Sequence, residues 1–255
     1  MSVLTYVYAL VRAPKRPQVR TAPAPVPAGE PVRLIAPAQG WWLVVSSVPA
    51  QEYVQQALEA KVQDLEWVGA RAVAHEAVVE HFLSCPALLP MQLFSLFTSD
   101  QRAVEHVLQT RDRIERILAR IERHVEWGVR LTWDEAAARQ AAQLRHEEEA
   151  VTTGTAYLAR KRDLLAGERS QWADARAAAD ALYGALARQA SAARRHSETE
   201  EAAPQSRVVL AAAFLVRRDA GTAFKAIVQR QSRALADAGV AIALTGPWPP
   251  YNFVA

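Results

Sequence analysis

The residues of this 255-residue chain that come closest to a catalytic set are His75, Glu76 and His81. Two histidines and a glutamate on one helix are the parts of a zinc hydrolase, but that chemistry needs histidines at positions i and i+4, on one face. Here the two histidines are six residues apart and point in different directions. The spacing therefore indicates structural or solvent-exposed histidines, and we expect no metal site.

The other reactive residue types also lack partners. Cys85 is the single cysteine, so it has no second thiol for a redox or metal pair, and a buried, inert thiol is the expected state. The ten glycines form no phosphate-binding spacing. Two groups of glutamates, at 147–149 and at 198, 200 and 201, are typical of solvated helix faces, and so are the arginines interleaved with acids over 111–123. We expect no catalytic residue, no cofactor and no enzyme activity.

Bulk composition narrows the class of protein. A hydrophobic fraction of 51% with 22% charged residues is typical of a soluble globular chain. The formal charge of +3, without a dense basic face, argues against nucleic acid as a partner. No apolar run is long enough to span a bilayer, and residues 1–12 lack the features of a signal peptide. A single cysteine is typical of a reducing compartment. We expect a cytoplasmic protein that does not enter the membrane.

Aromatic residues are the best candidates for an interaction site. Two adjacent tryptophans lie on one expected strand, so one should point inward and the other outward. The closing segment 245–255 combines three prolines with three aromatic residues, and such a stiff terminus is suited to lie against its own domain or a partner. We take five residues as candidate partner-binding residues: Trp41, Trp42, Trp248, Tyr251 and Phe253.

The elements that must position these residues begin with a β-branched, aromatic strand over 3–11. A proline-rich loop leads to a hairpin of strands at 32–36 and 41–48. Residues 51–84 are expected to be helical with a break near Ala60. The apolar residues of the second part spread along one face: Leu65, Val68, Ala72, Val79 and Leu83.

Periodicity is clearer from residue 88 onward. We expect a buried strand over 88–97 with Pro90 near its start, a helix over 99–123 capped by Ser99, and a half-buried strand over 125–133. Residues 134–196 are expected to be helical, with breaks at glycines and with an apolar residue every seventh position: Leu144, Val151, Leu158, Leu165, Trp172, Ala179 and Leu186. The candidate breaks are Gly154, Gly167 and Gly184. A loop at 197–205, a central strand over 207–216, a helix over 222–238 stopped by Gly239 and a strand over 240–244 complete the chain.

The order from residue 88 predicts an α+β fold with two domains. The first, residues 1–84, is a small α+β domain. The second, residues 85–255, has the strand–helix order of a modified ferredoxin-like (βαββαβ) domain, in which a long helical insertion at 134–203 replaces the central hairpin turn. We expect Trp248 and Phe253 to pack on this second domain, with the prolines capping the edge of its sheet.

Several segments together resemble the gas vesicle protein GvpL/GvpF family. The similar segments occur in the family's order and cover nearly the whole chain; the last of them is the most specific. They are residues 6–11 (Tyr-Val-Tyr-Ala-Leu-Val), 75–79 (His-Glu-Ala-Val-Val), 125–131 (Val-Glu-Trp-Gly-Val-Arg-Leu), 154–161 (Gly-Thr-Ala-Tyr-Leu-Ala-Arg-Lys) and 244–253 (Leu-Thr-Gly-Pro-Trp-Pro-Pro-Tyr-Asn-Phe).

One segment departs from the family pattern. Residues 89–97 stand where the family usually has Leu-Pro-x-Arg-Phe-Gly-Thr-Val-Phe, and here Gln92 replaces the arginine and Phe94 the glycine. If that arginine and glycine serve an interaction, this member has a shifted partner preference.

The resemblance implies a non-enzymatic accessory protein of gas vesicle assembly. Its expected partners are the small hydrophobic shell protein and other gas vesicle accessory proteins, and it is expected to shield or position shell subunits before they polymerise. Two other classes stay open: a ferredoxin-like enzyme or small-ligand-binding protein, and a structural scaffold that self-associates through the helices of 134–203.

Overall fold

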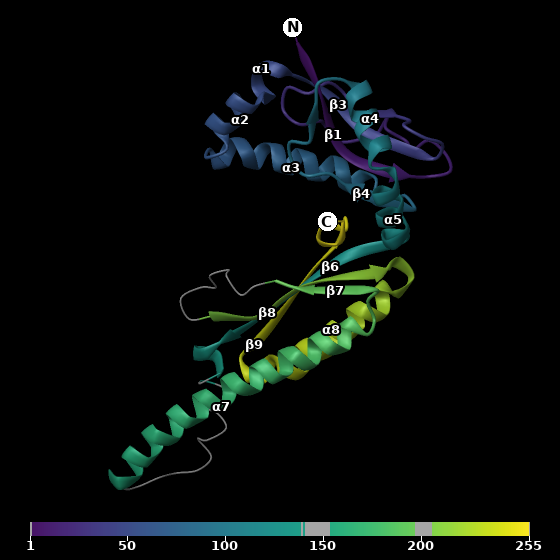
Figure 1. The fold of residues 1–255 in the computed structure, drawn as a ribbon. Coiled ribbons are helices and arrows are strands. Elements are labelled where there is room, and N and C mark those ends of the chain that lie inside the picture. The colour runs from purple at the N-terminus through teal and green to yellow at the C-terminus, as the bar shows by residue number, and fades with distance from the viewer. Residues whose placement is uncertain (1, 139, 141–153, 197–205, 255) are drawn as a thin grey trace. The chain divides into compact units, whose positions relative to one another are not determined.

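The structure is a computed structural model that describes residues 2–138, 140, 154–196 and 206–254. The chain divides into two compact units, Met1–Val125 with Trp248–Ala255, and Glu126–Pro247. Each unit combines helices with an antiparallel sheet, so the fold is α+β (Figure 1). The chain passes from the first unit to the second at residue 125 and returns at residue 248 for its last eight residues.

The sheet of the first unit is built around the first strand. Its strands are β1 (Val3–Arg12), β2 (Arg33–Ile35), β3 (Trp41–Pro49), β4 (Ala87–Pro90) and β5 (Leu96–Phe97). They are ordered β2-β3-β1-β4, with β5 also paired to β1. β1 runs antiparallel to β3 from the pair Val3–Pro49 to the pair Arg12–Trp41, with an irregularity between Val7 and Ala9. Strand β1 is buried from Tyr6 to Val11 because it is covered on both faces.

Helices cover both faces of this sheet. On one face, Tyr6 and Tyr8 pack against side chains from α1 (Ala50–Tyr53) and α3 (Leu65–His81), which are joined by α2 (Gln55–Lys61). On the other face, Val7 and Leu10 pack against α4 (Asp100–Gln109) and α5 (Arg111–Ile121). The apolar stripe expected along 99–123 is confirmed where it lies on α5, because Ile114, Ile117, Leu118 and Ile121 are all buried. The first unit is therefore a helix–sheet–helix sandwich.

The strand expected over 88–97 is two short strands with a loop between them. β4 ends at Pro90, which has no N–H to donate to a ladder, and Phe94 adopts a φ of 65° that interrupts any extended run. The expectation that this segment opens the second domain also differs from the structure. β4 pairs with β1, so residues 87–97 belong to the first sheet, and the compact units separate after Val125 instead of after residue 84.

The second unit follows the order strand, helix, strand, strand, helix, strand. Its elements are β6 (His124–Asp134), α7 (Gly154–Ala187), β7 (Ala192–Arg195), β8 (Ser206–Arg217), α8 (Gly221–Leu235) and β9 (Val240–Trp248). The sheet order is β7-β8-β6-β9. The central position expected for 207–216 is confirmed. The alternation expected for 125–133 is confirmed from Trp127 to Trp133, whereas Glu126, expected on the outer face, is buried together with Val125.

Three expectations for residues 134–205 need correction or lie outside the described residues. The helix ends at Ala187 instead of 196, because Ala192–Arg195 forms β7 against β8. Gly167 and Gly184 lie within α7 without breaking it, whereas Gly154 begins it. The segment therefore contributes the helix that follows β6 and does not replace a hairpin turn. Leu144, Val151 and the loop at 197–205 lie outside the described residues.

Candidate interaction surface

Helix α3 buries two polar residues on its inner face and exposes large apolar residues on its outer face. Arg71 and His75 are buried against the sheet, while Leu65 and Val73 are 85% and 72% exposed. Val78 and Val79 pack toward the core as in an ordinary amphipathic helix, but the exposure of Leu65 and Val73 departs from that arrangement. The inner face is stable only if its polar groups have partners, and the outer face is available for contact with another molecule.

His75 is held by a directional chain of hydrogen bonds. Its Nε2 lies 3.2 Å from the carbonyl oxygen of Met91, which can only accept, so Nε2 carries the hydrogen. Nδ1 then accepts from the hydroxyl of Tyr6 at 2.9 Å, and the Tyr6 oxygen accepts from the N–H of Phe94 at 3.3 Å. Burial lowers the pKa of His75 to about 4, against the weaker opposing effect of the bond to Met91. The imidazole is therefore neutral and structural at neutral pH.

Arg71 places a cation among aromatic rings on the same inner face. Its guanidinium carbon lies 3.7 Å from the ring centroid of Trp67 and 5.4 Å from that of Tyr53. It donates to the carboxylate of Glu52 at 3.1 Å and to the carbonyl oxygen of Trp67 at 3.2 Å. Stacking and a charge-assisted bond together offset the desolvation of the guanidinium. Arg71 and His75 thus fix which face of α3 looks outward.

The C-terminal tail docks on the first unit through polar contacts. The hydroxyl of Tyr251 donates to Glu76 on α3 at 2.5 Å, and the side chain of Arg120 donates to the carbonyl oxygen of Phe253. Burial, and then the carboxylate of Glu76, raise the pKa of Tyr251. Phe253 is 7% exposed, whereas Trp248 is 38% exposed. The tail is therefore anchored at Tyr251 and Phe253 and leaves Trp248 accessible.

This docking corrects the expected place of the tail. We expected its aromatics on the domain that ends with the last strand, with the prolines at that sheet's edge; residues 248–255 instead belong to the first unit. Pro249 and Pro250 are buried there, and Tyr251 packs in the cluster that includes Tyr6 and Tyr8. Two segments of the family resemblance, 75–79 and 244–253, thus meet through Glu76 and Tyr251.

The two adjacent tryptophans lie on opposite faces of β3, and both pack. Trp41 is 5% exposed in the cluster with α4 and α5. Trp42 is half-buried, and its indole N–H donates to the carbonyl oxygen of Ala13 at 3.2 Å. Of the five residues proposed from the sequence, Trp248 is the one with substantial exposure, and the structure brings Tyr251 and Phe253 together with it in the tail.

The sequence reasoning missed the apolar outer row of α3. The spacing predicts Leu65 and Val79 on one apolar face, but Val79 is buried and Leu65 is exposed. Leu65, Gly69 and Val73 recur at four-residue intervals and so lie along one line on the helix; Val62, 50% exposed, precedes them. A Cβ built on Gly69 meets no atom within 4 Å, so the row has an open notch at its centre. A signal was available in the sequence: Arg71 and His75 are also four residues apart, so they indicate a second face of the helix, distinct from that of Leu65 and Val73.

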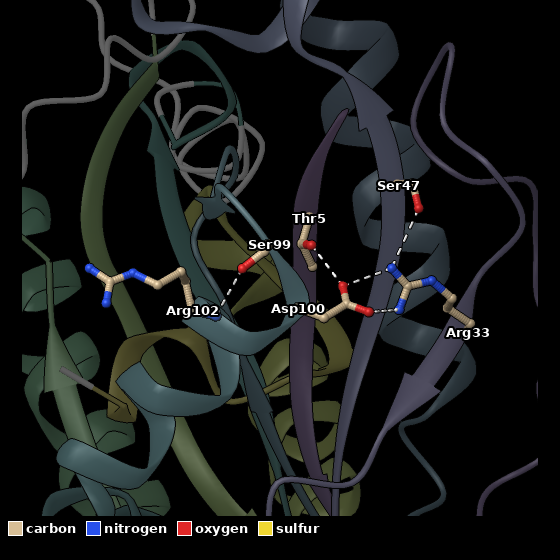
Figure 2. Close-up of polar contacts among 6 residues, drawn as sticks. All are labelled: Thr5, Arg33, Ser47, Ser99, Asp100 and Arg102. Carbon is tan, nitrogen blue, oxygen red and sulfur yellow. Dashed lines mark hydrogen bonds and ion pairs between the residues drawn. The ribbon is translucent and has the colours of Figure 1, made fainter. Parts of the chain in front are cut away.

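Figure 2 shows a polar cluster that fixes α4 to the sheet. Asp100, in the first turn of α4, accepts two hydrogen bonds from Arg33 at 2.8 Å each and one from Thr5 at 2.7 Å. The bonds from Arg33 are the main cause that lowers the pKa of Asp100. Ser99 caps the same helix by accepting from the N–H of Arg102. Both oxygens of Asp100 have donors, so this carboxylate is an anchor and not a free base.

The remaining reactive residues have separate surroundings. The Nε2 of His81 lies 3.1 Å from the carbonyl oxygen of Gln18, far along the chain from the partners of His75. Cys85 is partly buried beside the cluster that contains Tyr6. In the described part of the chain, no group of three or more histidine, cysteine or acidic side chains could hold a metal ion. Across the same residues, no helix has the length and apolar character needed to cross a membrane.

Comparisons with known proteins agree with the sequence resemblance. The family model "Gas vesicle synthesis protein GvpL/GvpF" matches residues 4–255. Gas vesicle protein L of Streptomyces sp. (strain CB03234) is 32% identical over 231 residues, covering 88% of this chain and 84% of that protein. The crystal structure of gas vesicle protein GvpF from Anabaena sp. PCC7120 matches with a TM-score of 0.70 at 16% identity, over 100% of this chain and 97% of that one. GvpF from Microcystis aeruginosa matches with a TM-score of 0.67 at 15% identity, over 100% of both chains. At such identities the two structures show likeness of fold alone.

Proposed function

The chain belongs to the gas vesicle synthesis protein GvpL/GvpF family, and we propose that it is a non-enzymatic accessory protein that assists gas vesicle assembly in the cytoplasm. It binds the small hydrophobic shell protein before that protein polymerises. The contact surface is the outer row of α3, defined here as Val62, Leu65, Gly69 and Val73, and exposed Trp248 is a second contact.

The observation that carries this proposal is the set of exposed apolar side chains on and just before α3. In the described residues, the large exposed apolar side chains all lie in the first unit, and four of the seven lie between residues 54 and 73: Val54, Val62, Leu65 and Val73. A contiguous exposed apolar surface on a soluble chain marks an interaction site. Covering one such side chain fully contributes roughly 1.5–3 kcal/mol, so a few of them support a reversible complex.

Reversibility suits the task of an assembly factor. A shell subunit with unpaired apolar surface aggregates, whereas one held too tightly cannot pass to the growing shell. A row of three side chains with polar surroundings covers apolar surface without enclosing the subunit. The inner face of α3, held by His75 and Arg71, keeps the row presented in one orientation.

The test is co-expression of the full chain with the shell protein, followed by affinity purification. The double variant Leu65→Ser/Val73→Ser should lose most of the co-purified shell protein, because it makes the row polar without disturbing a buried residue. Leu108→Ser is the matched control, since Leu108 is 42% exposed on α4, away from the row. Equal amounts of shell protein recovered with the unmodified chain, the double variant and the control variant would rule out this row as the contact. Normal vesicles in a deletion strain would contradict the assembly role itself.

We also propose that the second unit is a modified ferredoxin-like domain, with α7 and α8 as its two helices. The support is its βαββαβ order, with the first and third strands, β6 and β8, at the centre of the sheet. This places the long helix inside the domain's repeat instead of in an insertion between its halves.

The scaffold alternative is weakened by how α7 packs. Four apolar residues along one stripe of its C-terminal half are buried: Ala175, Ala179, Leu182 and Leu186. Helix α7 contacts β8 and α8 with this stripe, so the stripe is already used. We therefore expect light scattering to give a monomer mass for the full chain. A dimer that dissociates on removal of the helical segment would favour the scaffold.

A further inference from the structure

The outer row of α3 has a notch that nothing within the chain accounts for. Gly69 lies inside a 17-residue helix, where glycine is less favourable than alanine by about 1 kcal/mol. A Cβ at this position would have open space around it, so no packing within the chain requires glycine. Leu65 and Val73 stand one helical turn to either side. This arrangement forms a site into which a side chain of another molecule can insert.

Acidic side chains predominate among the exposed charged residues of the segment that carries this notch. Between residues 55 and 81, the exposed charged residues are four carboxylates, Glu59, Asp64, Glu66 and Glu80, and one amine, Lys61, which gives −4 + 1 = −3. The whole chain is +3, so the negative charge is local. Glu66 and Glu80 lie on the same exposed side of α3 as the row. A partner with positive charge beside its apolar surface complements this region.

The local charge also disfavours two other occupants. A second copy of this chain would bring the same acidic rim against itself. An anionic lipid surface would be repelled for the same reason. A protein segment with lysine or arginine beside an apolar stripe meets neither obstacle.

The conformation of that segment follows from the backbone of α3. Within a helix the N–H and C=O groups bond to one another, so the face offers no ladder to an added strand. An extended segment would lose solvent from its own backbone groups without replacement partners. A helical segment satisfies its backbone internally and can place a ridge of side chains in the gap between Leu65 and Val73.

We propose that the outer row of α3 receives an amphipathic α-helix of a vesicle protein, with an apolar stripe flanked by basic residues, and that this helix crosses α3 at Gly69. The inference rests on the proposed function and adds the shape and charge of the bound segment. It predicts that binding of such a helix depends on the open notch at Gly69, on the exposed acidic side chains and on the salt concentration.

The test uses the full chain and two synthetic 18-residue helical peptides with the same leucine stripe, one flanked by lysines and one by glutamates. Fluorescence anisotropy should show binding of the lysine peptide, weakening as NaCl is raised, and much weaker binding of the glutamate peptide. Gly69→Gln should reduce binding of the lysine peptide about tenfold, because it fills the notch. The helix is stabilised by this change, so unfolding cannot explain the loss.

Charge reversal separates the inference from the proposed function. The variant Glu66→Lys/Glu80→Lys should prefer the glutamate peptide, while Leu108→Ser should bind as the unmodified chain does. Equal affinity for both peptides, or no response to charge reversal, would overturn the inference even if the shell protein still co-purifies. Dimers that Leu65→Ser disrupts, or binding to anionic vesicles that Gly69→Gln abolishes, would also overturn it. If the unmodified chain binds the lysine peptide as predicted but does not co-purify with the shell protein, that result would instead count against the proposed function.

Discussion

Acidification should destabilise the first unit through one residue, His75. Its imidazole is buried and neutral, with Nδ1 accepting from Tyr6 and Nε2 donating to Met91. Protonation would put a hydrogen on Nδ1 and turn that bond into a contact between two donors. The unfolded chain has no such constraint, so it takes up the proton more readily than the folded protein.

The size of the effect follows from the two pKa values. The pKa of His75 falls from 6.5 to about 4 on folding. Because the folded pKa is the lower one, the stability is fully present above pH 6.5 and is lost as the pH falls toward 4. At pH 5 the loss relative to pH 7.5 is about 2 kcal/mol, from 1.36 kcal/mol per pKa unit over roughly 1.5 units.

Hydrogen exchange of the β1 amides measures this quantity for the first unit alone. His75→Gln is the reference variant, because glutamine keeps a donor toward Met91 and does not titrate. Carboxylates that titrate in both proteins cancel when the two pH dependences are subtracted. The change in opening free energy between pH 7.5 and 5 should be about 2 kcal/mol larger for the unmodified chain. The same pH dependence in both proteins would refute the buried, neutral state of His75.

Three other changes test the remaining contacts. Asp100→Asn should lower the unfolding free energy, measured by urea titration, by about 1 kcal/mol or less, since the half-exposed ion pair with Arg33 is screened by solvent. The pKa of Asp100 is lowered in the folded protein, so the stability that depends on its charge is lost only as the pH falls below 3.8. Phe94→Gly and Phe94→Ala both remove the ring stacked on Trp67, but only glycine adopts the positive φ of this position without strain. The glycine variant should therefore be more stable than the alanine variant by roughly 1 kcal/mol. An alanine variant of equal stability would contradict the strain. Tyr251→Phe removes the donor to Glu76 and should accelerate amide hydrogen exchange in residues 251–254 about tenfold or more, because a hydrogen bond to a charged acceptor is lost. Unchanged exchange would show that apolar packing alone holds the tail.

Local patterns were enough to predict many of the elements. The alternation along 127–133 and the stripe on α5 repeat with the period of one strand face and one helix face, and both are confirmed. Gly239 ends its helix with a φ of 70°, as its conformational freedom predicts. These features depend on residues close to one another in the chain, so they can be predicted from the sequence without knowledge of the fold.

Elements that depend on distant pairing were predicted less well. Ala192–Arg195 has the composition of a helix and becomes β7 only by pairing with β8. The sequence pattern predicts Leu88 and Leu89 in the sheet of the second domain, but they pair with β1 and so belong to the first sheet. Intrinsic preference is a weak determinant for such short segments, and the strand they meet in the folded chain decides their conformation.

The sequence by itself determined the composition, the periodic elements and the segments that resemble the gas vesicle family. The tertiary structure alone decided which of these segments meet, joining Tyr6 to His75 across 69 residues and Glu76 to Tyr251 across 175. It also decided which face of α3 looks outward. Periodicity can show that a helix has two distinct faces, but the layer that packs against one of them is set by the path of the chain. Buried partners for Arg71 and His75 hold these two side chains inward beside Val78 and Val79, and Leu65 and Val73 are left exposed.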